Sequence, residues 1–125
     1  MIRIDIPATS ANLGSGFDSL GIALTMCNRV WMEEADELKI TTTDKIKVPT
    51  DETNLIYWAA RHLYQICGKT LPGLHIIQEN NIPMARGLGS SSACIVAGIL
   101  GANRMLGSPM SQSDLINLAA QIEGH

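Results

Sequence analysis

The fold depends on the stretch Ile82-Pro-Met-Ala-Arg-Gly-Leu-Gly-Ser-Ser-Ser-Ala93. It follows a strand-like run, Leu74 to Asn80, and leads into a long apolar run, so its glycines and serines are expected at a helix N-terminus. The first N–H groups of a helix have no partner within the helix, and the helix dipole places positive charge there. The stretch therefore predicts an anion site, with a nucleotide phosphate as its natural guest.

Gly87 and Gly89 give this stretch backbone freedom. Glycine accepts positive φ and lets a ligand approach the bare backbone, while the serines add hydroxyl donors and oxygen ligands for a metal. The common phosphate-binding loop G-x-x-x-x-G-K-[ST] is excluded, because the stretch has no lysine. A dinucleotide fingerprint is excluded because three serines follow where its third glycine would lie. The structural alternative is a glycine-rich turn that only caps a buried helix.

Composition limits the class of protein. With 125 residues and 46% hydrophobic content, the chain is long enough for one globular domain with a core. A net charge of −3, and no basic cluster interleaved with aromatics, argue against a nucleic-acid partner. No signal peptide is visible, and the longest small and apolar run, Ala93 to Ala102, is too short for a membrane span. We therefore expect a soluble protein without a membrane partner.

The cysteines, Cys27, Cys67 and Cys94, are odd in number, far apart and embedded in apolar sequence. Their spacing offers neither a disulfide framework nor a zinc site. We expect buried thiols in a reducing cytoplasm.

Strands are expected mainly in the N-terminal half. Alternating isoleucines over residues 2–6 have the period of a half-buried strand, which Pro7 ends. Residues 8–21 are rich in Ser, Asn and Gly, which predicts a loop long enough to line a site. Strands over 22–32 and 38–43 are expected to pair antiparallel as a small meander around an acidic turn.

Two shorter runs complete the expected sheet. A short strand is predicted at Ile46 and Val48, and a longer one at Leu74 to Asn80, with His75 pointing outward.

Helices are expected over 54–67, over 91–106, and from the capping pattern Ser111-x-x-Asp114 to about Gly124. Apolar residues recur at three- and four-residue spacing in the first helix: Leu55, Trp58, Ala59, Leu63, Ile66 and Cys67. The second helix is apolar around most of its circumference, which predicts a central buried helix. Its Gly98 and Gly101 each lower intrinsic helicity by up to about 1 kcal/mol, so tertiary contacts must hold it.

This order of elements predicts an α+β fold, with a mixed, mainly antiparallel sheet and helices packed on one side.

Three motifs resemble one family. Pro7-Ala-Thr-Ser-Ala-Asn-Leu-Gly-Ser-Gly-Phe-Asp-Ser-Leu-Gly21 is similar to the sequence P-A-T-[ST]-A-N-L-G-x-G-F-D-x-[LF]-G that opens homoserine kinases. The stretch 82–93 resembles the phosphate loop of the galactokinase, homoserine kinase, mevalonate kinase and phosphomevalonate kinase (GHMP) superfamily. Glu123-Gly-His125 resembles the start of its glutamate motif, in the family's order.

The resemblance implies a fold, a reaction and a location. The fold would be the GHMP-kinase N-terminal domain, a two-layer fold similar to a ribosomal-protein domain. The reaction would be ATP- and Mg²⁺-dependent phosphorylation of the hydroxyl of L-homoserine to O-phospho-L-homoserine, in cytoplasmic threonine biosynthesis. The expected partner is this small-molecule substrate, and a homodimer stays open.

Homoserine kinases are longer, and their glutamate motif continues as E-G-H-P-D-N. The resemblance therefore implies that residues 1–125 form a truncated N-terminal ATP-binding domain, without the family's C-terminal ferredoxin-like domain. Activity is expected of the longer protein rather than of this part alone.

The resemblance also assigns the phosphate site. The ATP-binding residues would be Pro83, Met84, Ala85, Arg86, Gly87, Leu88, Gly89, Ser90, Ser91, Ser92 and Ala93, largely through backbone N–H groups. Mg²⁺ prefers oxygen ligands, and the resemblance supplies Ser91, with Ser90 or Ser92 as neighbours, and the catalytic Glu123. The structural alternatives are a solvated carboxylate for Glu123 and an arginine that faces water for Arg86.

The resemblance also places Asn12 and Asp18 among the residues that bind homoserine, where an amide and a carboxylate suit its amino group and hydroxyl. The alternatives are a turn residue for Asn12 and a cap for Asp18. Asp18 would also be catalytic if it takes the hydroxyl proton, but an ordinary aspartate is a weak base at neutral pH. Direct attack, with the phosphate chain taking the proton, stays open.

Other polar and aromatic residues have mainly structural interpretations. Asn54 is expected to cap a helix, although it could line the nucleotide base pocket. His62 and His75 lack partners at metal spacing, and Trp31 and Trp58 are expected in the core.

Rival functions are a kinase for another small alcohol, such as mevalonate or shikimate, a non-catalytic binding module, or an interaction domain whose glycine loop is only structural. The acidic balance argues against nucleic-acid binding by such a module.

Overall fold

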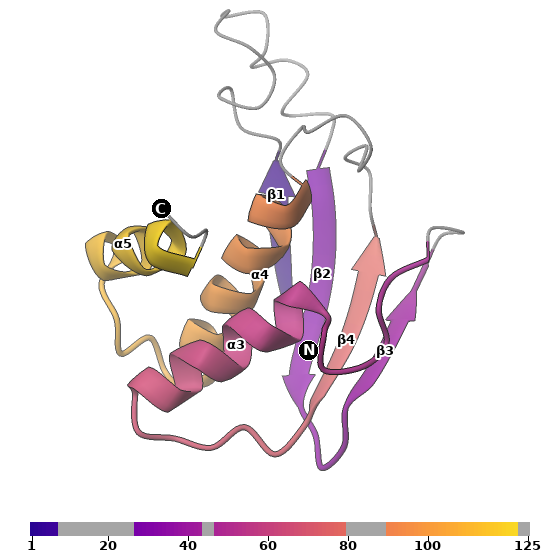
Figure 1. The fold of residues 1–125 in the computed structure, drawn as a ribbon, viewed down its shortest axis with the longest axis horizontal. Coiled ribbons are helices and arrows are strands. Elements are labelled where there is room, and N and C mark those ends of the chain that lie inside the picture. Colours follow the sequence, from indigo (N-terminus) through magenta and orange to yellow (C-terminus); the bar gives the residue numbers. More distant parts are fainter. Residues whose placement is uncertain (8–26, 44–46, 80–89, 123–125) are drawn as a thin grey trace, which may run out of the picture.

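The computed structural model describes residues 1–7, 27–43, 47–79 and 90–122. Within these ranges the chain forms a four-stranded sheet and three helices, in the order β1, β2, β3, α3, β4, α4, α5. Figure 1 shows α3 and α4 on the same side of the sheet, with α5 beside α4. The predicted α+β class, with a mainly antiparallel sheet and helices on one side, is confirmed.

The strands are β1 (Ile2–Pro7), β2 (Cys27–Glu34), β3 (Lys39–Thr42) and β4 (Leu74–Glu79). They lie in the order β1-β2-β4-β3. The β1–β2 and β2–β4 pairs are antiparallel, whereas β3 runs parallel to β4. The expected strands at 2–6 and 38–43 are confirmed, and so is the one expected at 74–80 up to Glu79. Of the strand expected at 22–32, residues 27–32 are confirmed and the strand extends to Glu34, whereas residues 22–26 lie outside the described ranges.

The predicted meander is wrong. β3 does not pair with β2, because β4 lies between them. Leu74 and Ile76 of β4 are both 0% exposed, so β4 takes the central place that its apolar side chains require. The short strand expected at Val48 is also absent from the described residues 47–50, and Ile46 lies outside the described ranges.

The connection from β3 through α3 to β4 is a left-handed crossover. In Figure 1 both strands point upward, α3 lies in front of the sheet, and the chain moves leftward from β3 to β4. Such connections are right-handed in nearly all proteins. The sequence patterns do not reveal the handedness of this crossover.

One face of the sheet forms the core. The register aligns Ile4 with Val30 and Met32 with Ile76, so alternate residues share the face beneath the helices. The buried apolar residues of this face are Ile4, Ile6, Val30, Met32, Ile40, Leu74 and Ile76. Trp31 and Ile77 point to the opposite face and are half-buried, so the expectation of a core Trp31 is wrong.

Helix α4 (Ser90–Met105) packs against α3 and against β1 and β2 of the sheet, which confirms the predicted central helix. Its glycines make this packing close. A Cβ at Gly98 would overlap the carbonyl oxygen of Ile56 and lie 2.9 Å from the Cβ of Ala59. A Cβ at Gly101 would overlap the sulfur of Met32 on β2. Close tertiary contacts therefore offset the loss of helix stability that the two glycines cause.

Helix α3 (Leu55–Ile66) begins at the N-cap Asn54, as expected, and Gly68 follows it at φ +73°. Its buried face differs from the predicted one: Ile56, Tyr57, Ala59, Ala60, Leu63 and Tyr64 are buried. Leu55, Trp58 and Ile66 are 38%, 44% and 52% exposed. The helix has apolar residues on two sides, and the side with small alanines faces α4, where backbones meet.

Helix α5 (Gln112–Ile122) follows a tight break, in which Gly107 and Ser108 both have positive φ. The buried Asn103 holds this break through both polar atoms, because Met110 N donates to Oδ1 at 3.0 Å and Nδ2 donates to Met110 O at 3.3 Å. The Ser111 hydroxyl accepts from the Asp114 N–H at 3.2 Å, which confirms the serine half of the capping pattern.

None of the helices in the described ranges combines the length and the apolar character that a membrane crossing requires.

The two glycine contacts of α4 give a matched stability prediction. Gly98→Ala should lower the free energy of unfolding by about 2 kcal/mol, because the new methyl meets backbone that must move. Gly101→Ala should cost about 1 kcal/mol or less, because the flexible side chain of Met32 can shift and alanine favours the helix. Urea denaturation of both variants measures the difference, and an equal loss would contradict it.

Candidate functional site

Three strand ends lie together at one end of the sheet. Pro7, the last residue of β1, pairs with Cys27, the first of β2, and Arg29 pairs with Glu79, the last of β4. Figure 1 shows the N-terminus of α4 at the same end. The segments 8–26 and 80–89, in which the sequence places the substrate and phosphate residues, are therefore both attached to this end.

The first turn of α4 has the properties of an anion site. Ser90, Ser91, Ser92 and Ala93 form this turn, so the prediction that the serines open a helix is confirmed. The turn carries no acidic residue. The positive end of the dipole of this 16-residue helix is thus not offset by a carboxylate of its own first turn.

The other predicted site residues lie outside the described ranges. These are Asn12, Asp18, Pro83, Met84, Ala85, Arg86, Gly87, Leu88, Gly89 and Glu123. Their roles stay predictions, and so do the roles of the side chains of Ser90, Ser91 and Ser92. Ala93 is 5% exposed and belongs to the core at the base of the helix.

Asn54 is fully occupied as a structural residue. Its Oδ1 accepts from the N–H groups of Ile56 at 2.9 Å and Tyr57 at 3.4 Å. Its Nδ2 donates to Pro49 O at 2.9 Å and to Gln78 Oε1 at 2.8 Å. The N-cap interpretation is confirmed. Because both amide hydrogens are used within the protein, the side chain has none left for a nucleotide base in this arrangement.

Gln78 was missed at the sequence level. It lies on the inner face of β4, two residues after Ile76, and is 2% exposed. A polar residue in a position that strand alternation assigns to the core was the available signal. Gln78 also ties β3 to β4 through its backbone, because its carbonyl accepts from Thr43 N at 3.0 Å.

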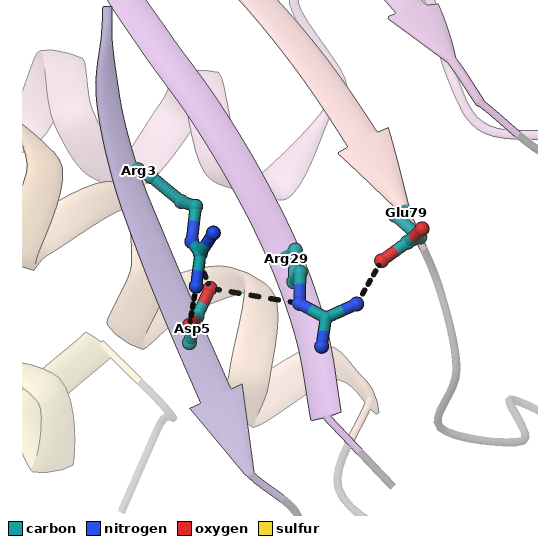
Figure 2. A network of polar contacts seen from close by, with 4 residues as sticks. All are labelled: Arg3, Asp5, Arg29 and Glu79. Carbon is teal, nitrogen blue, oxygen red and sulfur yellow. Dashed lines mark hydrogen bonds and ion pairs between the residues drawn. The ribbon is translucent and has the colours of Figure 1, made fainter.

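A charged network crosses the outer face at the same end of the sheet (Figure 2). Arg3 donates two hydrogen bonds to Asp5, at 3.0 and 2.8 Å. Arg29 Nη1 donates to Glu79 Oε2 at 2.7 Å, and Arg29 Nε lies 3.9 Å from Asp5 Oδ1. One arginine on β2 therefore links the ends of β1 and β4 from which the two predicted loops begin.

The titration of Asp5 reflects this network. Hydrogen bonds from Arg3 hold the pKa of the Asp5 carboxyl below its ordinary value, and the charges of Arg3 and Arg29 add to this effect. The carboxylate is half-exposed, so each of these pairs contributes little stability by itself.

The remaining candidates have structural surroundings. His62 stacks on Trp58 with ring centroids 5.4 Å apart, and this tryptophan is exposed rather than in the core as expected. His75 lies half-exposed with Nδ1 3.7 Å from Glu33 Oε1. Within the described part of the chain, no group of three or more His, Cys, Asp or Glu side chains could hold a metal ion.

Cys67 and Cys94 are free thiols that are half-buried and pack against the hydrophobic core, so the expectation of buried thiols is met only in part for these two. Burial nevertheless raises the pKa of the Cys94 thiol to about 11, which keeps it protonated at neutral pH.

Comparisons with known proteins assign the family. The family described as GHMP kinases N terminal domain matches residues 54–125, which is more than half of the chain. The chain therefore belongs to the GHMP kinases, through their N-terminal domain.

Individual relatives are more specific. The chain is 49% identical over 129 residues to the homoserine kinase of Trichodesmium erythraeum, and 47% identical over 128 residues to that of Petrotoga mobilis. These matches cover 99% and 100% of this chain but 42% of each relative, so the chain spans less than half of their length. The crystal structure of homoserine kinase from Cytophaga hutchinsonii matches with a TM-score of 0.72 at 28% identity, covering 94% of this chain and 39% of that one.

The network in Figure 2 predicts an acid-dependent loss of stability. Because the pKa of Asp5 is lower when folded than when unfolded, its contribution is present above the ordinary value of 3.8 and is lost as the pH falls through the folded pKa. Asp5→Asn should therefore reduce the loss of stability in this acidic range. The urea midpoints of the variant and the wild type at neutral and strongly acidic pH measure this pH dependence. Asp36→Asn, in the exposed turn after β2, is the control. An unchanged pH dependence would contradict the prediction.

Proposed function

We propose that this chain is the ATP-binding N-terminal part of a homoserine kinase, which phosphorylates the hydroxyl of L-homoserine to O-phospho-L-homoserine. The observation that carries the proposal is the 47–49% identity, along essentially the whole chain, to proteins of that name. The geometry supports it, because the segments with the predicted phosphate and substrate residues are attached to one end of the sheet. In the longer protein a C-terminal ferredoxin-like domain would complete the enzyme.

The phosphate site would combine the glycine loop with the start of α4. Phosphoryl transfer asks a protein mainly for positioning and for stabilisation of the charge on the phosphoryl oxygens. The backbone N–H groups of four residues would position the phosphates of ATP and stabilise their charge: Gly87, Gly89, Ser90 and Ser91. The absence of acidic side chains from the first turn of α4 fits a highly anionic ligand.

Mg²⁺ would bind the hydroxyl of Ser91 and the carboxylate of Glu123. Oxygen ligands of this type, together with phosphate oxygens, suit this ion, which would neutralise charge on the transferred group. The described part of α4 and α5 fits this role in one respect: α5 ends at Ile122, directly before Glu123, and packs beside α4, whose first turn contains Ser91.

The substrate would be held by Asn12 and Asp18 in the segment between β1 and β2. Asn12 suits the amino group of homoserine, and Asp18 suits its reacting hydroxyl. Whether Asp18 takes the hydroxyl proton, or the phosphate chain does, is a question for pH–rate profiles.

The cellular setting follows from the proposed reaction. The product would enter threonine biosynthesis in the cytoplasm, and the partner would be the small-molecule substrate rather than a nucleic acid or a membrane. A homodimer is the assembly to test first by light scattering.

Substrate choice can be tested directly with the full-length protein that contains this chain. A panel of L-homoserine, mevalonate and shikimate, with Mg-ATP and ADP release as the readout, should give turnover with homoserine at least about 100-fold above the others in kcat/KM. Turnover of mevalonate but not of homoserine would reject the proposed substrate and keep the kinase. No ATP-dependent turnover with any alcohol would favour a non-catalytic module.

The glycine loop provides a second test. Gly89→Val should raise the KM for ATP by at least about tenfold, because a branched side chain blocks the approach of phosphates to the backbone. The KM for homoserine should change much less. Glu123→Gln should instead raise the Mg²⁺ concentration needed for half-maximal rate. Wild-type ATP and Mg²⁺ dependence in both variants would contradict these roles.

A further inference from the structure

Asn54 and Gln78 form a buried polar pair on the helix side of the sheet. The Asn54 Nδ2 donates to Gln78 Oε1 at 2.8 Å, and both residues are 2% exposed. Asn54 is the N-cap of α3, and Gln78 is the next-to-last residue of β4. One hydrogen bond therefore joins the start of a helix to the end of the strand that leads to residues 80–89.

Burying an amide side chain at this core position costs free energy unless the amide is hydrogen-bonded. Leu74 and Ile76 occupy the two preceding inner positions of β4, and an apolar side chain would continue the series without needing a partner. A buried amide pair is sensitive to position, because a relative shift of α3 and β4 would leave its donor and acceptor unpaired. The pair therefore favours one placement of the end of β4.

We propose that the Asn54–Gln78 hydrogen bond supports tight binding of ATP by fixing the end of β4, from which residues 80–89 begin, so that both residues are positioning residues. This inference rests on the proposed function, because the nucleotide role of residues 80–89 is part of it. Only Glu79 separates Gln78 from that segment.

The surrounding contacts explain how the bond acts. Asn54 also donates to Pro49 O at 2.9 Å, which fixes the chain before α3. The Gln78 carbonyl accepts from Thr43 N at 3.0 Å, which fixes the edge strand β3 against β4. The end of β4 is thus held by its side chain and its backbone. Binding through backbone N–H groups is sensitive to such placement, since a shift of about 1 Å can cost about 100-fold in a well-aligned site.

Two variants of the full-length protein separate this role from simple stability. Gln78→Leu removes the acceptor and fills the space with apolar atoms. Asn54→Ser keeps a helix-capping oxygen but is too short to reach Gln78. Each should raise the KM for ATP about tenfold, which corresponds to the loss of one good hydrogen bond, while the KM for L-homoserine stays within about twofold. The rise in the KM for ATP in the double variant should be smaller than the product of the two single effects, because both substitutions remove the Asn54–Gln78 hydrogen bond.

Asn103→Ser is the matched control. Asn103 is also a buried amide, 6% exposed, but it binds the backbone of Met110 at the opposite end of α4. This variant should lower the melting temperature without changing the KM for ATP. The positioning role is overturned by an unchanged KM for ATP in the Asn54 and Gln78 variants, by an equal rise in both KM values, or by the same rise in Asn103→Ser.

Failure of the proposed function would look different. If the wild-type protein does not phosphorylate homoserine, the proposed reaction is rejected, and equilibrium titration of Mg-ATP against the same variants still tests the positioning role. A wild-type protein that binds no ATP rejects both. If Gln78→Leu does not fold, Asn54→Ser decides the outcome, because it retains the helix cap.

Discussion

The close contact between α4 and its neighbours is the constraint on which the rest of this structure depends. Gly98 lets α4 approach the backbone of α3 at Ile56, and Gly101 lets it approach Met32 in the middle of the sheet. A helix held by two such close contacts cannot slide or rotate without overlap, because close-packed interiors do not deform smoothly. Its N-terminus is therefore fixed at the end of the sheet where β1 and β4 finish.

At that end of the sheet, polar side chains link neighbouring elements on both faces. On the inner face, Asn54 and Gln78 join α3 to β4, and on the outer face Arg29 joins the ends of β1 and β4. The two sets of interactions differ in burial. The inner pair is buried and depends strongly on geometry, whereas the outer pairs are half-exposed and are weakened by salt. Together they give two predicted binding segments a common, well-defined base.

The order of layers also explains why a nucleotide site suits this fold. A long helix whose N-terminus emerges at a sheet end offers N–H groups and positive potential where loops converge. The chain supplies a first turn without carboxylates there, and a small core residue, Ala93, at its base. The fold alone does not choose the substrate, because folds of one class carry many different activities.

Short-range patterns in the chain predicted most of the local elements, because these elements follow from interactions between residues close in sequence. Alternating isoleucines predicted β1, the apolar repeat from Asn54 predicted α3 with its cap, and the serines after Gly89 predicted the start of α4. The motifs also predicted the family. The tertiary structure alone decided how these pieces pair: β4 lies between β2 and β3, β3 runs parallel to it, and the crossover is left-handed. It also decided which side of α3 is buried, and that the amide of Gln78 meets Asn54. These outcomes depend on contacts between residues far apart in the chain, and a local pattern of polarity carries no information about which distant partner will be present.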